Sequence, residues 1–409
     1  MLRCGLLGRK LAHSYSPEIH RELGAYEYRL YEVEPESLGD FLENGPWDRL
    51  NVTIPYKQAV IPYLSALSET AKGAGSVNTL VRLPDGGILG DNTDVWGFLA
   101  MVRKSGLRVP GKKALVLGSG GASRAVCYAL DTLGARPVVI SRTGENNYTN
   151  LDLHRDASLV VNTTPVGMYP DNASAPLSLT HFPALEGVLD IIYNPARTAL
   201  LLEAESRGIP AVNGLYMLVE QARKASERFT GTEIPEAETE RIFRLLSGKM
   251  QNIVLVGMPG SGKSAVAALL AEKLGRPLAD SDEEIVKDTG MPIPEYFARY
   301  GEAAFREAET RVLRTLSKAS GTVIATGGGC VTVPGNYAIL HGNSRIVWIR
   351  RDISLLPRDG RPLSAGADLQ AMYARRAPMY ARFADVQTEN NGTAEETADA
   401  VIRALGGVK

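Results

Sequence analysis

The sequence predicts an α/β fold in which most strands form parallel sheets. Short apolar runs alternate with helical patterns along the chain, and two of these runs end in glycine-rich turns near residues 118 and 257. The length of 409 residues exceeds what one hydrophobic core usually serves. A charged helical stretch over about 234–249 lies between the two turns and is the predicted domain boundary.

The charge balance argues against a partner that binds through overall electrostatic attraction. Lys and Arg total 45 and Asp and Glu total 46, so no overall field attracts nucleic acid or an anionic membrane. No apolar run approaches the roughly 18 residues that a membrane-spanning helix needs. Cys4, Cys127 and Cys330 are odd in number and widely spaced, which favours free thiols over a disulfide or zinc framework. We expect a cytoplasmic protein with no nucleic-acid and no membrane partner.

The first 100 residues form one predicted α/β unit. Residues 1–10 are typical of a short strand that runs into a glycine turn, without the apolar core of a signal peptide. Residues 48–54 form another strand, which Pro55 ends because proline cannot donate a hydrogen bond to the sheet.

A second unit begins with the strand over 113–118. Its continuous apolar run is typical of a strand buried on both faces of a parallel sheet. A helix over 122–133 follows, and further strands are expected at 137–140, 159–162 and 188–192. The sequence therefore predicts a doubly wound sheet with right-handed crossovers.

The turn after the first strand of this unit is a variant dinucleotide-binding motif. It runs over 118–123, and the next strand ends in Ser141, Arg142 and Thr143. In NAD-binding proteins, an acidic residue at the end of this next strand binds the ribose 2′-hydroxyl. An arginine with neighbouring hydroxyls binds the 2′-phosphate of NADP instead. The residues favour NADP(H). The short interval 144–162 predicts that the helix usually found there is cut down.

Residues 257–264 (GMPGSGKS) match the phosphate-loop pattern G-x-x-x-x-G-K-[ST]. The loop lies between an apolar strand over 252–257 and a helix over 265–274, which is the context that the motif requires. Its backbone N–H groups are expected to bind the β-phosphate of ATP, with Lys263 on the β- and γ-phosphates and Ser264 on Mg²⁺. The sequence therefore predicts an MgATP site.

The motifs after this loop identify what the second half resembles. In order they are residues 280–282 after a short strand, 301–309 on a helix, 327–329 at a strand end, Arg361, and residues 376–380. Together with the phosphate loop, this order is similar to shikimate kinase over about 252–405.

This resemblance implies roles for individual residues. Arg306 and Arg376 would bind the substrate carboxylate, and Asp282 would orient or deprotonate the reacting hydroxyl. Asp280 would lie on the magnesium side, and Arg361 would belong to a lid that stabilises the transferring phosphoryl group. The backbone of Gly327, Gly328 and Gly329 would approach the substrate ring. The ATP ligands would be Gly260, Ser261, Gly262, Lys263, Ser264, Ala265 and Arg361, with Ser264 and Asp280 on the Mg²⁺ side.

A second resemblance covers the first half of the chain. Its blocks are residues 14–17, 51–57, 75–79, 91–94 and 213–222, in that order. This set resembles shikimate dehydrogenase over about 1–235. The resemblance implies a substrate domain, then a Rossmann-type domain, then a return of the chain that completes the cleft.

In this resemblance Lys57 and Asp94 are the catalytic pair. The lysine would donate to the carbonyl oxygen during hydride addition, and the carboxylate would orient it. The implied substrate ligands are Ser14, Ser16, Thr53, Asn78, Asp94, Tyr193 and Gln221. The implied cofactor ligands are Glu69, Gly118, Ser119, Gly120, Gly121, Ala122, Ser141, Arg142, Thr143, Ile191 and Gly214.

The two resemblances together imply a bifunctional enzyme with NADP(H), ATP and Mg²⁺ as cofactors. It would reduce 3-dehydroshikimate to shikimate and then phosphorylate shikimate at its 3-hydroxyl. The alternative is an NAD(P)-dependent quinate/shikimate dehydrogenase fused to a P-loop module that senses nucleotide. The oligomeric state stays open, with a homodimer as one option.

The expected architecture is an N-terminal α/β substrate domain plus a Rossmann-type NADP domain, followed by a P-loop kinase α/β/α domain with a parallel sheet. The dehydrogenase-like part would cover 1–235, with its substrate domain at about 1–100 and 214–235 and its NADP domain at about 101–213. A linker would follow at 236–250. The kinase-like part would cover 251–409.

Overall fold

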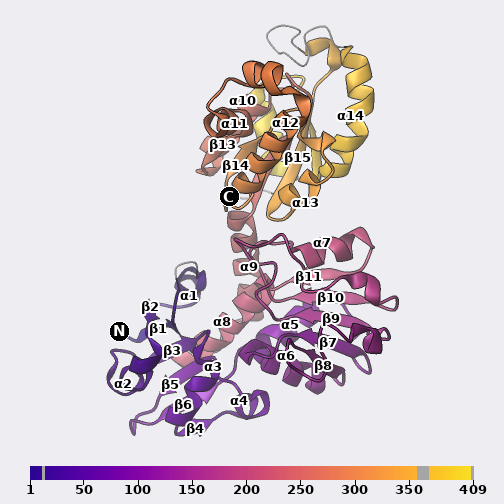
Figure 1. Cartoon of the computed structure of the whole chain (residues 1–409). Coiled ribbons are helices and arrows are strands. Elements are labelled where there is room, and N and C mark those ends of the chain that lie inside the picture. The colour runs from indigo at the N-terminus through magenta and orange to yellow at the C-terminus, as the bar shows by residue number, and fades with distance from the viewer. Residues whose placement is uncertain (12–13, 357–367, 407–409) are drawn as a thin grey trace. The chain divides into compact units, whose positions relative to one another are not determined.

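The computed structural model describes residues 1–11, 14–356 and 368–406 (Figure 1). The chain forms two compact units. The first comprises Met1–Tyr193 and Thr198–Arg244, and the second comprises Asn194–Arg197 and Leu245–Lys409. The segment expected as a linker is helix α9 (Glu236–Met250). No helix within the described ranges is long and apolar enough to cross a membrane.

The first unit begins with a six-stranded sheet in the order β2-β1-β3-β5-β6-β4. β1 is parallel to β2 and β3, whereas β5 is antiparallel to β3 and β6. Trp47, Leu50 and Leu80 are fully buried in its core. The strands are β1 (Arg3–Gly8), β2 (Glu27–Glu32), β3 (Arg49–Val52), β4 (Ala66–Leu67), β5 (Thr79–Arg82) and β6 (Ile88–Asp91). The helices are α1 (Ser16–Leu23), α2 (Leu38–Asn44), α3 (Tyr56–Ala59) and α4 (Glu69–Ala74).

A second sheet of this unit has five parallel strands in the order β11-β10-β9-β7-β8. Alternate residues of β7 belong to different core clusters: Ala114 and Val116 to one, Leu115 and Leu117 to the other. This burial of both faces explains the continuous apolar run in the sequence. The strands are β7 (Lys113–Leu117), β8 (Arg136–Ile140), β9 (Leu159–Asn162), β10 (Gly187–Asp190) and β11 (Ala211–Asn213). The helices are α5 (Asp94–Ser105), α6 (Gly121–Thr132), α7 (Ala199–Ser206) and α8 (Leu215–Thr230).

The connection between β8 and β9 contains only a short 3₁₀ turn, Leu151–His154, so the reduced helix expected from the sequence is confirmed. Asparagine side chains organise this connection. Asn150 Oδ1 accepts from the N–H of Asn147, and Asn146 Oδ1 lies 3.0 Å from Nε2 of His154. The first of these contacts joins a side chain to the backbone, and such bonds stabilise turns in place of a helix.

The second unit is built on a five-stranded parallel sheet in the order β13-β14-β12-β15-β16. Alternate residues of β12 again face two cores, Ile253 and Leu255 in one and Val254 and Val256 in the other. The strands are β12 (Asn252–Val256), β13 (Leu278–Asp280), β14 (Val323–Ala325), β15 (Ser344–Arg350) and β16 (Val386–Glu389). The helices are α10 (Lys263–Leu274), α11 (Ser281–Thr289), α12 (Ile293–Leu316), α13 (Asn336–His341), α14 (Leu369–Phe383) and α15 (Ala394–Ala404).

The predicted α/β class is confirmed in both units. The sheets of β7–β11 and β12–β16 are parallel, whereas the sheet of β1–β6 is mixed. Two helices begin slightly earlier than expected. α6 begins at Gly121 rather than 122, and α10 begins at Lys263 rather than 265. In both cases the motif glycines run directly into the helix, so the helix N-terminus lies within the motif itself.

Candidate active sites

Lys57 and Asp94 form an ion pair in the first unit. Lys57 lies on the short helix α3, Asp94 is the first residue of α5, and Lys57 Nζ lies 2.6 Å from Asp94 Oδ2. The two side chains are 16% and 9% exposed, so the pair is largely shielded from water. A cation held by an oriented carboxylate is suited to donate a proton or a hydrogen bond to a developing oxyanion.

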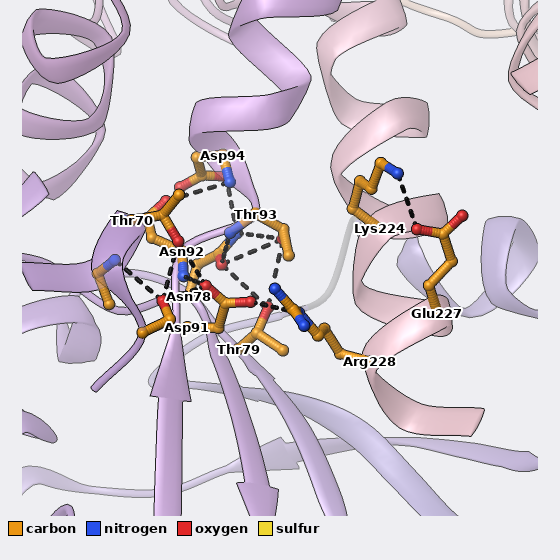
Figure 2. Close-up of polar contacts among 12 residues, drawn as sticks. Thr70, Asn78, Thr79, Asp91, Asn92, Thr93, Asp94, Lys224, Glu227 and Arg228 are labelled. Carbon is orange, nitrogen blue, oxygen red and sulfur yellow. Dashed lines mark hydrogen bonds and ion pairs between the residues drawn. The ribbon is translucent and has the colours of Figure 1, made fainter. Parts of the chain in front are cut away.

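Asn78 holds the other oxygen of this carboxylate. Its Nδ2 donates to Asp94 Oδ1 at 2.9 Å and to Thr93 Oγ1 at 3.0 Å, while its Oδ1 accepts from the N–H of Thr93 (Figure 2). Gln221 of α8 also reaches Asn78, with 3.4 Å between Gln221 Oε1 and Asn78 Nδ2. The structure therefore brings Lys57, Asp94, Asn78 and Gln221 together, although 164 positions separate 57 from 221.

Other predicted substrate ligands lie on neighbouring segments. Ser14 Oγ accepts from the N–H of Ser16, which is buried at the start of α1. Thr53 directly follows β3, and its N–H donates to Leu7 of β1. Tyr193 packs edge-to-face against Tyr15, and burial raises the pKa of Tyr193 to about 12. Tyr193 therefore remains a neutral phenol over the whole physiological range.

The dinucleotide turn joins β7 to α6. Gly118 has φ +108°, a conformation that favours glycine, and a Cβ there would lie 3.0 Å from Thr163 Oγ1. Ser119 and Gly120 are exposed, and a Cβ at Gly120 would meet open space. Gly121 and Ala122 then start α6. An accessible glycine loop at a helix N-terminus fits the pyrophosphate of a dinucleotide.

The remaining predicted cofactor residues lie at three places in the first unit. Ser141, Arg142 and Thr143 follow β8, and the N–H of Ser141 donates to the carbonyl of Asn146. Gly214 packs so closely on the carbonyl of Ile191 that a Cβ would overlap it. Glu69 differs from these, because its carboxylate is 88% exposed and pairs with Lys72 of its own helix.

In the second unit, the phosphate loop joins β12 to α10. Gly262 has φ +89°, and a Cβ there would overlap the amide of Asn390, so the position needs glycine on both counts. Asn390 Nδ2 also donates to the Ser261 carbonyl at 2.7 Å. Lys263 is buried, with Nζ 3.0 Å from the carbonyl oxygens of both Gly257 and Met258. The loop leads directly into the N-terminus of α10, where the helix dipole and the first backbone N–H groups favour an anion.

Ser264 and Asp280 provide neighbouring oxygens beside this loop. Ser264 Oγ donates to Asp280 Oδ2 at 2.8 Å, and Asp280 Oδ1 accepts from the N–H of Asp282. One hydroxyl and one carboxylate fit Mg²⁺, which keeps several waters and takes only one or two protein ligands beside substrate phosphates. Gly260 and Ala265 flank these residues on the loop and on α10.

Arg306 lies against the glycine run after β14. Its Nη1 pairs with Glu309 Oε2 at 2.8 Å, and the guanidinium occupies the space that a side chain on Gly329 would take. Glu309 is fully buried. Burial, together with the nearby Asp282 charge, raises the pKa of Glu309 against the opposing effect of Arg306. A Cβ at Gly327 would lie 2.8 Å from Asp282 Oδ1, which places Asp282 at the same glycines.

Arg376 reaches this region from α14. It is buried, and its Nη1 donates to the Gly328 carbonyl at 3.3 Å, which also accepts from the hydroxyl of Tyr380. The three glycines are therefore the meeting point of two cations and a carboxylate: Asp282 lies at Gly327, Arg376 at Gly328 and Arg306 at Gly329. Arg361 lies outside the described residues.

Three residues that we did not predict contribute to these sites. Glu309 pairs with Arg306. The two residues are three positions apart on one helix, and this spacing could have predicted the ion pair from the sequence. Tyr380 and Asn390 support Gly328 and Ser261 through backbone carbonyls. Asn390 lies 129 positions after Ser261, and nothing local in the sequence indicates that contact.

Comparison with known proteins decides the family. Residues 6–80 match the family model of the shikimate dehydrogenase substrate binding domain, and residues 259–406 match that of shikimate kinase. The NADP(+)-dependent shikimate dehydrogenase of Clostridium perfringens (strain SM101 / Type A) is 34% identical over 264 residues, which cover 59% of this chain and 97% of that protein. The chain belongs to the shikimate dehydrogenase family.

Two solved structures of shikimate dehydrogenases resemble the first unit. A chorismate mutase/shikimate 5-dehydrogenase fusion protein from Clostridium acetobutylicum is 36% identical with a TM-score of 0.57, covering 60% of this chain and 97% of that one. The shikimate 5-dehydrogenase of Thermus thermophilus, in complex with NADP(H) and shikimate, is 33% identical with a TM-score of 0.55, covering 60% and 99%.

These findings place a shikimate dehydrogenase in the first unit and a shikimate kinase domain in the second. The chain is a bifunctional enzyme of the shikimate pathway that uses NADP, ATP and Mg²⁺. The resemblances stated from the sequence are confirmed.

Proposed function

We propose that the first unit reduces 3-dehydroshikimate to shikimate with NADPH, and that the second unit phosphorylates the 3-hydroxyl of shikimate with MgATP. The observation that carries the proposal is the shielded Lys57–Asp94 pair, which lies beside the first glycine of α6. A Cβ at Gly121 would lie 3.0 Å from the Cβ of Lys57, so the cofactor loop and the acid–base pair adjoin. The product of the first site, shikimate, has a carboxylate and hydroxyl groups. Arg306, Arg376 and Asp282 of the second site are the residue types that bind such groups.

In the dehydrogenase reaction, NADPH supplies the hydride. Lys57 Nζ donates to the substrate carbonyl oxygen and delivers the proton that makes it a hydroxyl. Asp94 stabilises the lysine cation and holds Nζ in place, and Asn78 fixes that carboxylate through its other oxygen. Neutral donors at Ser14, Ser16 and Tyr193 and the amide of Gln221 bind the carboxylate and hydroxyls of the substrate.

In the kinase reaction, MgATP supplies the phosphoryl group. Arg306 and Arg376 bind the substrate carboxylate, and Asp282 accepts the proton of the attacking hydroxyl. Ser264 and Asp280 would hold the Mg²⁺ ion, which would neutralise charge on the ATP phosphates. Lys263, which bonds to the carbonyls of Gly257 and Met258, turns to the phosphates when the nucleotide binds.

The domain boundaries and the cellular location are parts of the same proposal. We place the dehydrogenase at 1–235, the connecting segment at 236–250 and the kinase at 251–409. The three cysteines are free, which suits a reducing cytoplasm. Only small-molecule partners are needed for either reaction.

The test is a single incubation of purified protein with 3-dehydroshikimate, NADPH and MgATP. NADPH absorbance is followed, and shikimate 3-phosphate is measured by mass spectrometry. Loss of NADPH with accumulation of the phosphate ester supports both activities and their order. If shikimate forms and no shikimate 3-phosphate is detected, the second unit is not a shikimate kinase. A separate assay compares quinate and NAD with shikimate and NADP; faster turnover of quinate with NAD would replace the proposed substrate of the first unit.

A further inference from the structure

The side chain of Asn92 connects the start of α5, which carries Asp94, to the segment that precedes β5. Asn92 is fully buried between β6 and α5. Its Oδ1 accepts from the N–H of Asp94 at 3.1 Å, and its Nδ2 donates to Ser76 at 2.8 Å (carbonyl) and 2.9 Å (hydroxyl). Both hydrogens of the carboxamide are thereby used. One buried amide therefore ties the backbone of Asp94 to Ser76.

Ser76 extends this path to the cofactor side. It is also fully buried, and its Oγ donates to the carbonyl of Gly121, the first residue of α6, at 3.1 Å. The next residue, Val77, donates its N–H to the carbonyl of Lys57 at 2.7 Å. The segment 76–77 thus contacts both the lysine of the catalytic pair and the dinucleotide turn.

Asp91 anchors the start of this path. Its carboxylate is 3% exposed and accepts from the N–H of Asn92, the hydroxyls of Ser68 and Thr70, and Arg228 Nε at 2.7 Å (Figure 2). Burial alone would raise the pKa of Asp91, but these hydroxyl bonds and the Arg228 charge hold it below its usual value. The turn that carries Asn92 is therefore held from both α4 and α8.

We infer that Asn92 is a positioning residue for hydride transfer: through Ser76 it sets the distance between the Lys57–Asp94 pair and the dinucleotide turn. The inference rests on the proposed dehydrogenase function. Hydride transfer requires the reacting atoms in close, aligned contact, so a small displacement of the cofactor turn lowers the rate strongly. The carboxamide suits this role because it makes both an acceptor bond and donor bonds in one rigid plane.

The experiment compares Asn92→Ala, Ser76→Ala and the double variant. Readouts are kcat, the KM for NADPH, and the Kd for NADP⁺ by titration. Ser76→Ala is expected to raise the KM and the Kd about three- to tenfold, and Asn92→Ala to do so and also to lower kcat at least about tenfold. The double variant should resemble Asn92→Ala within about twofold, because both residues act on one path.

The matched control is Ser226→Ala. Ser226 is a fully buried serine of the same unit, and its hydroxyl accepts a hydrogen bond from Tyr26. We expect it to change stability but to leave kcat, the KM and the Kd within about twofold of the unmodified enzyme. A purely structural role for Asn92 and Ser76 predicts the same pattern for them as for this control.

Two results would overturn the inference: unchanged NADP⁺ affinity in Ser76→Ala, or losses that multiply in the double variant. If Asn92→Ala fails to fold, the Ser76→Ala affinity decides alone, because that variant removes one hydroxyl only. If the unmodified protein binds NADP⁺ without reducing 3-dehydroshikimate, the proposed function fails. The shift in NADP⁺ affinity still decides the link between Ser76 and the cofactor turn.

Discussion

Gly329 and Arg306 are in contact, backbone against guanidinium, so closely that a Cβ on residue 329 would overlap the terminal nitrogens of the arginine. Gly329 has φ −103°, which any residue adopts. The position therefore needs glycine for space and not for backbone conformation. Arg306 has little freedom to retreat, because the buried Glu309 holds its other side.

Gly329→Ala is expected to displace Arg306 and to lower the kinase kcat/KM for shikimate about tenfold to hundredfold, the loss of one or two charge-assisted hydrogen bonds. Dehydrogenase activity should not change. The matched control is Gly335→Ala, where a Cβ would meet open space within the same unit. Full kinase activity in Gly329→Ala would mean that Arg306 is not a substrate ligand.

Glu309→Gln keeps the shape of the side chain but removes the charge that holds Arg306. We expect the KM for shikimate to rise about tenfold while the KM for ATP stays constant, because the arginine loses a buried ionic partner. Glu302→Gln is the control, since Glu302 also faces Arg306 but is 61% exposed and 3.3 Å away. Equal effects of the two variants would contradict the special role of the buried carboxylate.

Lys57→Ala removes the proposed proton donor of the first unit. Dehydrogenase kcat should fall at least about a hundredfold, the usual contribution of a general acid, and the kinase should be unaffected. Lys104→Ala serves as control, because Lys104 also pairs with a carboxylate, Glu240 at 2.7 Å, but on the surface. Retention of more than half of the dehydrogenase activity in Lys57→Ala would remove the lysine from the mechanism.

Lys263→Ala tests the second unit and should have the reverse effect of Lys57→Ala on the two activities. We expect loss of phosphorylation by at least about a hundredfold with normal NADPH oxidation, because the variant lacks the cation at the transferring phosphate. Lys273→Ala, on the same helix α10 and paired with Glu395 and Asp399 at the surface, should behave as the unmodified enzyme. Loss of both activities in Lys263→Ala would indicate failed folding rather than a local defect.

His20 predicts how the first unit responds to acid. The ring is stacked on Tyr28 at 4.0 Å, and burial lowers its pKa to about 3. The unfolded chain binds a proton at this histidine below its ordinary pKa of about 6.5 and the folded chain does not. The free energy of unfolding therefore carries no penalty from His20 above pH 6.5. Below pH 6.5 it falls, and the loss due to this histidine is roughly 2 kcal/mol at pH 5.

The variant His20→Phe keeps an aromatic ring but cannot titrate. Urea unfolding at pH 5 and pH 7 should show a smaller pH difference for this variant than for the unmodified chain. His181→Gln, at a half-exposed histidine of the same unit, should keep the full difference. An equal pH dependence in all three proteins would assign the acid sensitivity to other groups.

The parallel sheets and both glycine-rich turns could be predicted from the sequence, because their signals are local. The apolar run at 113–118 and the loop at 257–264 each specify a strand, a turn and a helix start over a few residues. The convergence of Lys57, Asp94 and Gln221 could be inferred only by resemblance, since no pattern of spacing states which loops meet in space.

Some site residues could not be found in this way. Asn390 supports the phosphate loop through one backbone carbonyl, and Asn92 acts through Ser76 and Gly121. Such contacts depend on the strand order of the folded sheet, and an asparagine in a turn is usual without any ligand. The role of Arg361 as a lid residue stays a prediction, because Arg361 lies outside the described residues.

Helix α8 determines when the dehydrogenase can mature during synthesis. Its residues Ala225 and Phe229 pack on Cys4 near the start of β1, and it also carries Gln221. A growing chain that ends before residue 230 therefore holds a substrate sheet with an uncovered apolar surface, the stage at which chaperones or aggregation act. The kinase sheet draws its strands from one uninterrupted stretch, 252–389, so its assembly on the ribosome waits for no distant segment.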